Sequence, residues 1–212
     1  MSIITMATSK GGAGKTTVAQ ALLGTLARHG HRVATIDADF NHTLSRWVST
    51  FAAYPIDARA ELDETRIVPL AAELEEKHDL VVIDTAGAAT QATVFGIGTA
   101  DLVLVPIQLS SSDIVEAIKT VKLVKSASEM TRRNIPARVI FTDYQPNTNI
   151  ATHAEEEVRR YELPALDTKL NRLVAFKEMT FTGEVPHGGT AGVQVNMLLK
   201  ELKALGALPF LK

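Results

Sequence analysis

A glycine-rich run near the start of the chain combines the residue types that can hold a phosphate group. It reads Lys10-Gly11-Gly12-Ala13-Gly14-Lys15-Thr16-Thr17. Small residues let the backbone curl so that successive N–H groups can point at phosphate oxygens. Lys15 can reach the β- and γ-phosphates of a nucleotide, and the Thr16 hydroxyl can hold Mg²⁺. The run therefore predicts a nucleotide-binding site built from all eight residues.

The residues on either side predict a strand before this run and a helix after it. Ile3–Ala7 is an apolar run, and Thr16–His29 has a helical pattern. A helix that begins at the glycine-rich run directs the positive end of its dipole at the same anion. The alternative is a glycine-rich turn whose lysines are only solvated. The strand, the flanking lysines and the helix together favour the phosphate site.

Two further predicted strands end in acidic residues. Arg32–Asp37 ends in Asp37 and is followed closely by Asp39, and Leu80–Asp84 ends in Asp84. Because ligands in open α/β sheets bind beyond the carboxyl ends of the strands, these acids are expected beside the phosphate loop. We predict that Asp84 joins Thr16 in binding Mg²⁺. For Asp39, a solvated acidic turn is the alternative.

Apolar, β-rich runs alternate with helical patterns along the whole chain. The expected strands are Ile3–Ala7, Arg32–Asp37, Leu80–Asp84, Leu102–Pro106, Arg138–Thr142 and a short one near Ala165-Leu166. The expected helices are Thr16–His29, Thr43–Phe51, Thr65–Lys77, Ser112–Ala127, Ile150–Tyr161, Arg172–Met179 and Val193–Leu205. This alternation predicts an α/β three-layer sandwich, a mostly parallel twisted sheet with helices on both faces, in one domain over residues 1–212. Thr182–Gly192 is expected to be a surface loop or a hinge near the nucleotide, and Trp47 a packing residue.

Composition excludes several classes of function. Hydrophobic residues make up 46% of the chain, charged residues 22%, and the net charge is −2, so any contact with nucleic acid must use a local patch. There is no cysteine, which excludes disulfides and a cysteine-ligated iron–sulfur cluster. No run approaches the ~20 apolar residues of a membrane span, and no signal peptide is visible. The sequence predicts a cytoplasmic protein.

The lysine at the start of the glycine-rich run carries a family resemblance. A generic P-loop, G-x-x-x-x-G-K-[ST], would have glycine at position 9, where this chain has Ser9 followed by Lys10. The pattern KGGxGKT resembles the deviant Walker A motif of the ParA and MinD ATPases. In that family the early lysine crosses to the nucleotide of a second subunit. The resemblance therefore implies an ATP-bound homodimer with Lys10 in the interface, and ATP and Mg²⁺ as cofactors.

The same resemblance implies roles for the acidic residues. Asp39 matches the residue that positions the attacking water, and Asp37 the one nearer Mg²⁺, which gives Thr16, Asp37 and Asp84 as the metal site. Lys10 and Lys15 complete the catalytic set with Asp39. The usual Pro-Gln after the second acid is Phe40-Asn41 here, so contacts of this switch segment are expected to differ. No glutamate follows Asp84, which implies slow hydrolysis.

Recognition of the base and of DNA is also inferred from the resemblance. Thr142 and Asp143 follow a strand that leads to the adenine pocket in relatives, although a plain strand-to-helix turn fits equally well. Gly183–Pro186 falls where relatives close over the base. Basic residues that match a nonspecific DNA-binding surface are Lys169, Arg172 and Lys177. The alternative is that these residues are solvated, since acidic and basic residues nearly balance in this third of the chain.

The function implied is that of a small ParA-type partition ATPase. An ATP-bound dimer would bind nucleoid DNA, and a ParB-like activator on a plasmid, chromosome or protein cargo would stimulate hydrolysis. The tract Asp37–Trp47, with the later Phe176-Lys177-Glu178-Met179, also resembles the VirC-type accessory ATPase of conjugative DNA transfer. The alternative is a MinD-like membrane-surface switch, which needs an amphipathic, basic C-terminal helix; here Gly206 and Pro209 interrupt the tail and its positive charge is modest. A metabolic ligase of the dethiobiotin synthetase kind is disfavoured by Lys10.

Overall fold

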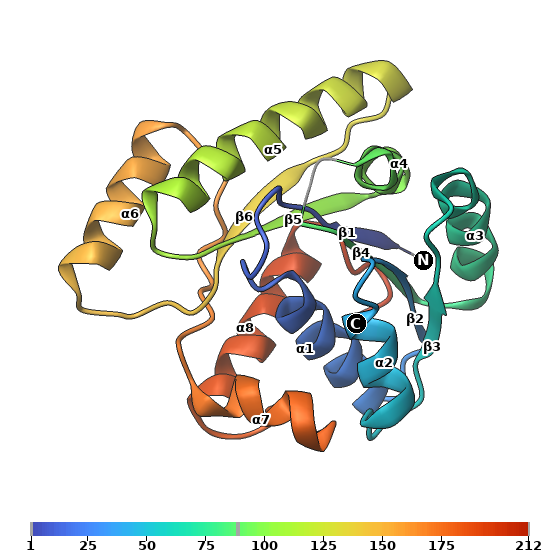
Figure 1. The fold of residues 1–212 in the computed structure, drawn as a ribbon. Coiled ribbons are helices and arrows are strands. Elements are labelled where there is room, and N and C mark those ends of the chain that lie inside the picture. The colour runs from blue at the N-terminus through green and yellow to red at the C-terminus, as the bar shows by residue number, and fades with distance from the viewer. Residues whose placement is uncertain (1, 88–89, 212) are drawn as a thin grey trace.

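A computed structural model describes residues 2–87 and 90–211 of the chain, and these form one six-stranded sheet flanked by helices (Figure 1). The strands are β1 (Ile3–Met6), β2 (Val33–Ala38), β3 (Asp57–Ala60), β4 (Leu80–Thr85), β5 (Leu102–Ile107) and β6 (Ala137–Phe141). The helices are α1 (Lys15–Arg28), α2 (Thr43–Thr50), α3 (Glu64–Lys77), α4 (Gln91–Thr99), α5 (Ser111–Thr131), α6 (Asn149–Arg160), α7 (Val174–Thr182) and α8 (Gly189–Ala204). The sheet order is β3-β2-β4-β1-β5-β6, and every pairing is parallel.

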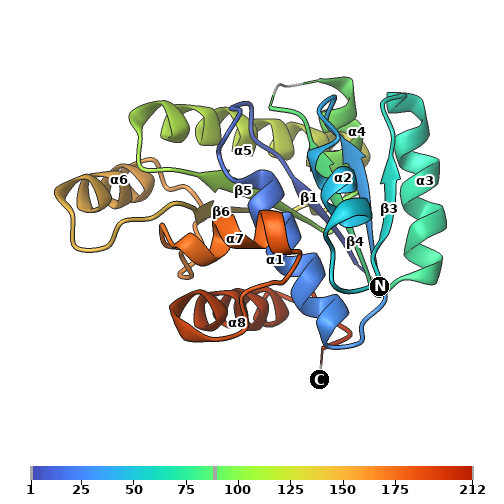
Figure 2. The same ribbon diagram turned by 60° about the horizontal axis from the view of Figure 1, so that its bottom comes forward.

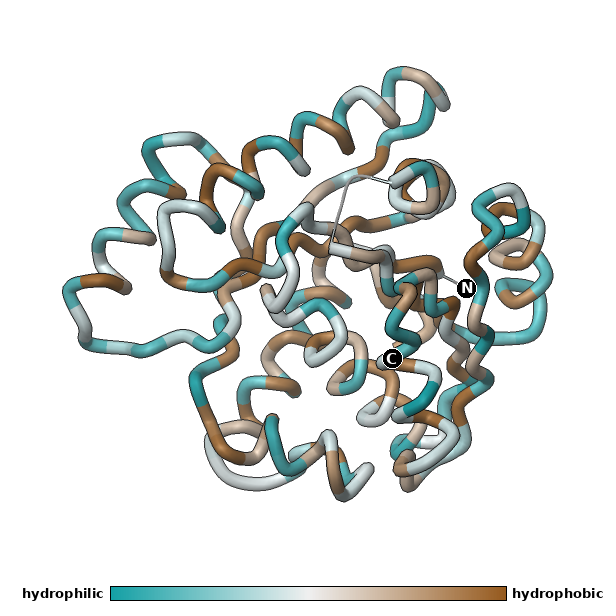
Figure 3. Tube along the Cα trace, viewed as in Figure 1, coloured by the Kyte–Doolittle hydropathy of each residue, from teal (hydrophilic) through white to brown (hydrophobic). Residues whose placement is uncertain are grey.

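Both faces of the sheet are apolar because helices cover both of them. Alternate strand residues such as Ile4 and Val82 pack with α1, α2, α7 and α8, whereas Ile3, Val81 and Val103 face α3, α4 and α5. Figures 1 and 2 show these two helical layers on opposite sides of the sheet, and Figure 3 shows hydrophobic residues gathered on the central strands. The predicted three-layer α/β fold is confirmed.

The parallel arrangement brings the carboxyl ends of the central strands to one edge. Met6 at the end of β1 lies opposite Asp84 of β4, and Asp84 lies opposite Asp37 of β2. The glycine-rich loop leaves β1 beside β4, and β2 lies on the other side of β4. The sheet register therefore places the loop and the two predicted acids side by side.

The sequence predictions missed one strand and one helix. They also predicted a strand where there is only a bridge, and a loop that is too long. The predicted long strands agree with the structure to within a residue at each end. β3 was missed because Asp57–Ala60 is a charged, exposed edge strand with no apolar run, and α4 because its two glycines obscure a helical pattern. Near Ala165 there is a single parallel bridge to Val139 instead of a strand. The predicted loop Thr182–Gly192 is shorter, because α7 reaches Thr182 and α8 begins at Gly189.

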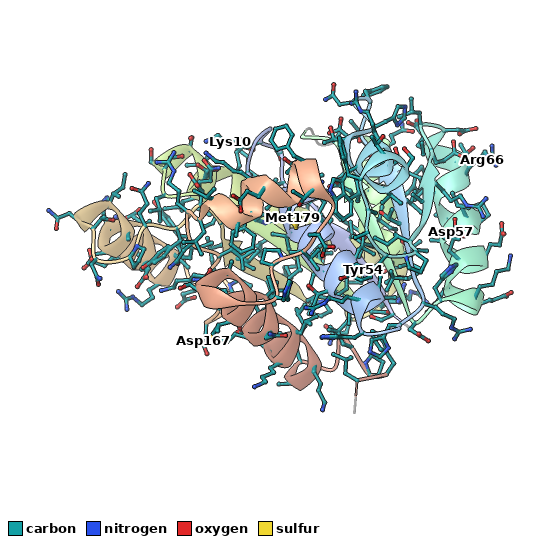
Figure 4. The ribbon with its side chains drawn as sticks, turned by 90° about the horizontal axis from the view of Figure 1, so that it is seen from below. Lys10, Tyr54, Asp57, Arg66, Asp167 and Met179 are labelled. Carbon is teal, nitrogen blue, oxygen red and sulfur yellow. The ribbon has the colours of Figure 1, made fainter. Side chains whose placement is uncertain are left out.

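Two contacts join α2 to the end of α7. The Trp47 Nε1 donates a hydrogen bond of 2.9 Å to the carbonyl oxygen of Met179, and Trp47 is buried, which confirms it as a packing residue. Met179 is labelled on α7 in Figure 4. Gly183 ends α7 with a φ of 72°, and a Cβ at this position would lie 1.5 Å from the carbonyl oxygen of Phe51. Only glycine fits this close approach of two backbones. The helix after β2 is therefore fixed to the helix before α8.

We predict that Gly183→Ala lowers the free energy of unfolding by about 3 kcal/mol, because the added methyl must displace the Phe51 backbone in addition to straining φ. Gly206→Ala is the matched control. Gly206 has a φ of 76°, but no atom lies within 4 Å of the place that a methyl group would occupy there, so it should lose only about 1 kcal/mol. Urea unfolding measures both. Equal losses would contradict the proposed close packing of the two backbones.

Candidate nucleotide-binding site

The glycine-rich loop leaves the start of α1 open to an anion. The N-cap residue Gly14 has a φ of 93° and provides no side-chain cap. The first turn of α1, which is fully described, contains no acidic residue. The first N–H groups of a helix have no partner within it, and its dipole favours negative charge at this end. The loop and the start of α1 therefore have the geometry and charge that suit an anion at the predicted position.

Thr142 supports the loop from behind. Its hydroxyl lies 2.7 Å from the Ala13 carbonyl oxygen and 3.1 Å from that of Ile107, to which it can donate. A Cβ at position 14 would lie 2.8 Å from the Thr142 Oγ1, so this contact requires Gly14. The Gln108 side chain also donates to the Gly12 carbonyl oxygen over 2.9 Å. Residues after β5 and β6 thus hold the loop, a role that the sequence did not reveal.

The Lys15 ammonium is buried and has few hydrogen-bond acceptors around it. The residue is 6% exposed, and its Nζ donates one hydrogen bond, of 3.3 Å, to the Lys10 carbonyl oxygen. Burial lowers the pKa of Lys15, and the nearby Asp84 and Asp39 carboxylates act in the opposite direction. An ammonium has three donors, so this one has capacity for further acceptors. A phosphate group would supply both the acceptors and the charge.

Asp84 and Thr16 form the centre of the predicted metal site. The Thr16 hydroxyl donates a 2.8 Å hydrogen bond to Asp84 Oδ2, and Asp84 Oδ1 is buried without a hydrogen-bond partner among the described residues. Burial raises the pKa of Asp84 to about 7; the Thr16 hydrogen bond and Lys15 lower it, while Asp37 and Asp39 add to the rise. A hydroxyl beside an unpartnered carboxylate oxygen is the oxygen donor set that suits Mg²⁺. The residues present fit this ion.

The two acids at the end of β2, Asp37 within the strand and Asp39 just after it, have different environments. Asp37 is fully buried, and its oxygens accept hydrogen bonds from the backbone N–H groups of Asp39 (3.2 Å) and Ser45 (2.8 Å). It therefore holds the loop that follows β2 and the first turn of α2. Asp39 is partly exposed and accepts from the N–H of Asn41 over 2.8 Å. Asp39 lines a cavity of about 290 Å³ together with the glycine-rich loop and Gly87.

The Lys10 side chain does not contact the glycine-rich loop's own anion site. Its Nζ lies 2.8 Å from Asp113 Oδ2, 3.0 Å from Ser112 Oγ and 3.2 Å from Ser110 Oγ, all at the start of α5. Asp113 was not among the residues predicted from the sequence to have a role. The one signal for it was the run Ser110-Ser111-Ser112-Asp113 after β5, which has the pattern of a helix N-cap.

A second cavity, of about 390 Å³, adjoins the loop at Gly12, Gly14 and Thr17. Its apolar walls come from Leu170, Leu173, Phe176 and Phe181, and its polar groups include Thr142, Asn171 and an ion pair of 3.3 Å between Arg172 and Asp143. An apolar slot with a few polar groups suits a planar base. The structure thus places both predicted base residues, Thr142 and Asp143, at this cavity.

The three predicted DNA-binding residues do not form a single patch. Arg172 and Lys177 line the 390 Å³ cavity, whereas Lys169 lies in a different depression, paired with Glu155 and 4.8 Å from the centre of the Tyr144 ring. The segment Gly183–Pro186, expected to close over the base, does not line the cavity and instead borders a depression beside α7. Val185 of this segment is buried in the core.

Comparison with known proteins agrees with this geometry. The solved structure of Cyanothece McdA(D38A) with ATP is similar at a TM-score of 0.78 and 18% identity, covering 97% of this chain and 96% of that one. Rhizobium radiobacter protein ParA is 31% identical over 147 residues, or 69% of this chain and 66% of that protein. Protein virC1 of the same organism is 31% identical over 191 residues, or 86% and 82% of the two chains.

The fold and the loop define a P-loop ATPase of the ParA and MinD type. Within that class the chain belongs to the VirC1 protein family, whose model matches residues 1–187. In residues 2–87 and 90–211 no helix is both long and apolar enough to cross a membrane.

We predict that Asp84→Asn removes a pH dependence of stability. With its pKa raised to about 7, Asp84 keeps its proton in the folded metal-free protein while the unfolded chain releases it. Stability should therefore fall as pH rises from about 4 to 7, and Asp84→Asn should exceed the wild type by about 2 kcal/mol at pH 8. Urea unfolding in EDTA measures this, with the exposed Asp167→Asn as control. An unchanged pH slope in Asp84→Asn would contradict the assignment.

Proposed function

We propose that this protein is a ParA-type ATPase that positions DNA or protein cargo through cycles of ATP binding and slow hydrolysis. The observation that carries the proposal is the group formed by the buried Lys15 and Asp84 with the hydroxyl of Thr16 at the open end of α1. A buried ammonium with spare donors and a carboxylate with a spare oxygen are matched to a nucleotide phosphate with its Mg²⁺. The McdA structure of the same fold is an ATP complex, which supports this choice of ligand.

Each residue of the site has a distinct part in the proposed reaction. Thr16 and Asp84 would hold Mg²⁺, which neutralises phosphate charge when bound. Lys15 binds phosphate oxygens together with the backbone N–H groups of the loop. Asp39, which lines the cavity and is partly exposed, accepts a hydrogen bond from the attacking water and orients it. Asp37 acts by fixing the loop that carries Asp39, since both of its oxygens are used by backbone N–H groups.

The base of the nucleotide is proposed to occupy the cavity lined by Phe176 and Phe181. This cavity meets the phosphate loop at Gly12 and Gly14, so one ligand can fill both sites. Asp143 and Arg172 provide an acceptor and donors at its edge. An adenine ring suits the apolar walls and this small polar set.

Dimerisation is proposed to complete the site. Lys10 does not use its charge at the phosphate loop of its own chain, and its side chain is about a third exposed (36%). In an ATP-bound homodimer it would reach the phosphates of the second subunit. This arrangement couples hydrolysis to association, which is the behaviour of a switch.

Nonspecific DNA is the proposed surface for the dimer, with a ParB-like protein on the cargo as activator. Among the described residues no carboxylate pairs with Lys177, whereas Arg172 and Lys169 are engaged by Asp143 and Glu155. Of these three residues Lys177 is therefore the most available for DNA phosphates, and binding should weaken with salt. A MinD-like membrane role has less support, because Leu198, Leu199 and Leu202 of α8 are buried in the core instead of being free to enter a bilayer.

We predict that Lys15→Ala and Lys10→Ala each lower ATP turnover at least about a hundredfold, for different reasons. Lys15→Ala should fail to bind ATP, because it removes the ammonium from the phosphate site. Lys10→Ala should bind ATP and remain monomeric. Fluorescent-nucleotide titration and analytical ultracentrifugation separate the two outcomes.

Mixing these two variants tests whether Lys10 acts across subunits. A Lys15→Ala subunit can supply Lys10 to the ATP held by a Lys10→Ala subunit, so the mixture should regain part of the wild-type turnover. If Lys10 acts only within its own chain, the mixture will be as inactive as either variant alone. The surface variant Glu157→Gln mixed with wild type provides the control for dilution.

We predict that Asp39→Ala binds ATP, dimerises and hydrolyses ATP at least about a hundredfold more slowly than the wild type. The carboxylate is lost from the wall of the cavity, while the groups proposed to hold the nucleotide are untouched. Single-turnover hydrolysis and gel filtration with ATP measure the two properties. Normal hydrolysis by Asp39→Ala would assign the water-positioning role to another residue.

A further inference from the structure

Lys169 is anchored by two side chains from separate parts of the chain. Its ammonium pairs with the carboxylate of Glu155 on α6, and its Nζ lies 4.8 Å from the centre of the Tyr144 ring, within the range of a cation–π contact. The Tyr144 hydroxyl donates a hydrogen bond to the same oxygen of Glu155. The hydrogen bonds from Lys169 and from Tyr144 lower the pKa of Glu155. The three side chains therefore form one connected group.

This group is partly shielded from water. Tyr144 is buried, and the side chains of Lys169 and Glu155 are 30% and 26% exposed. The lysine side of the pair is thus much less exposed than Arg160, which is 71% exposed in its own pair on α6. Water and salt screen a partly buried ion pair less than an exposed one. The Lys169 ammonium is therefore held in place and is poorly placed to serve a second anion.

The residues directly after Lys169 form one wall of the cavity of about 390 Å³. The wall residues are Leu170, Asn171 and Arg172. They run beside the end of β6, where the Tyr144 N–H donates to the Leu170 carbonyl oxygen over 3.0 Å and the Arg172 N–H donates to the Tyr144 carbonyl oxygen over 2.8 Å (Figure 1). Lys169 itself lines a separate depression of about 180 Å³. It therefore anchors the start of this wall from outside the cavity.

The same group holds both members of the ion pair at the cavity. Asp143 directly precedes Tyr144, and Arg172 lies on the segment that begins at Lys169. Asp143 has a φ of 50°, in the left-handed region that favours glycine. A non-glycine residue keeps such a backbone only where the surrounding contacts hold it. Tyr144, fixed by Glu155 and by the two backbone hydrogen bonds, supplies contacts of this kind.

We propose that Lys169 is a positioning residue for the base of the nucleotide, acting with Glu155 and Tyr144, and is not a contact for DNA phosphates. The inference rests on the proposed location of the base in the 390 Å³ cavity. Lys169 does not touch the base, and instead keeps Asp143 and Arg172 where the edge of the base can meet them. Loss of its charge should weaken only the part of the nucleotide affinity that depends on this wall.

The test compares the binding of ADP and of inorganic pyrophosphate by isothermal titration calorimetry with Mg²⁺. Both ligands offer two phosphates, only ADP carries a base, and neither can be hydrolysed at a γ-phosphate. Lys169→Met keeps an apolar stem and removes the ammonium. It should raise the dissociation constant of ADP about five- to tenfold, the effect of losing one charge-assisted hydrogen bond, and leave that of pyrophosphate unchanged. General damage to the phosphate loop would raise both constants and overturn the inference.

Two further variants show whether Lys169 acts through its partner. Glu155→Gln keeps the shape of the side chain and removes the counter-charge, and should weaken ADP binding about threefold. The double variant should lose no more than Lys169→Met alone, because both changes break one pair. If Lys169→Met does not fold, Glu155→Gln decides the question, and unchanged ADP binding in the folded variants overturns the inference.

Arg160→Met is the matched control. Arg160 also pairs with a glutamate of α6, over 3.2 Å, and lies 5.7 Å from the centre of a tyrosine ring, but it does not line the 390 Å³ cavity. Its loss should leave both dissociation constants unchanged. An equal loss of ADP affinity in Arg160→Met would mean that any weakened ion pair on α6 has this effect, which contradicts a specific role for Lys169.

DNA binding provides an independent readout. Fluorescence anisotropy with a random-sequence duplex, at saturating ATP, should give the same affinity for Lys169→Met as for the wild type. Lys177→Ala, at the cation proposed to contact DNA, should bind more weakly. If Lys169→Met loses DNA affinity and keeps ADP affinity, Lys169 is a DNA contact and the inference is wrong.

Phe181→Ala distinguishes this failure from failure of the proposed base site. Phe181 lines the same cavity and is largely exposed, so its truncation spares the core. If Phe181→Ala weakens ADP binding while Lys169→Met does not, only the positioning role of Lys169 is lost. If neither variant changes ADP binding, the base lies elsewhere and the proposed site fails first.

Discussion

The hydrogen bond from Thr16 to the buried Asp84 is the contact on which the site depends. It joins the first turn of α1 to the end of β4 and leaves one carboxylate oxygen free toward the loop. Parallel pairing of β4 with both β1 and β2 fixes this position, since Asp84 lies opposite Met6 on one side and Asp37 on the other. A shift in register of either neighbour would separate the acid from the hydroxyl. The sheet therefore positions the residues proposed to hold the metal before any ligand arrives.

The same burial accounts for the chemistry of the site. Asp84 and Lys15 are both buried away from water. Burial raises the pKa of Asp84 and lowers the pKa of Lys15, and each shift favours the uncharged form of the side chain. Such groups bind ligands of opposite charge strongly because little water has to be displaced. Asp39 lies at the edge of this buried region and remains partly exposed. The structure thus separates the groups that would hold a nucleotide from the one proposed to orient water.

Much of the fold and the phosphate site could be predicted from the sequence, because both depend on local pattern. Buried parallel strands appear as short apolar runs, and the glycine-rich loop has few other uses between a strand and a helix. The edge strand β3 could not be found in this way, because Asp57 and Arg59 pair with each other and are partly exposed to solvent, and neither packs in the core. Asp113 was also missed, since its meaning depends on Lys10, more than a hundred residues away in the chain. Contacts of that kind depend on tertiary structure and leave only a helix-cap pattern in the sequence.

The bond between Trp47 and Met179 has a mechanical consequence. α2 follows directly from the segment that contains Asp39, and α7 supplies Phe176 to the wall of the larger cavity. Since the indole is buried and the two backbones touch at Gly183, neither helix can slide without carrying the other or breaking these contacts. If the proposed nucleotide fills both cavities, a movement at its phosphate end would be passed through this rigid connection to its base end, and the two parts of the pocket should loosen together.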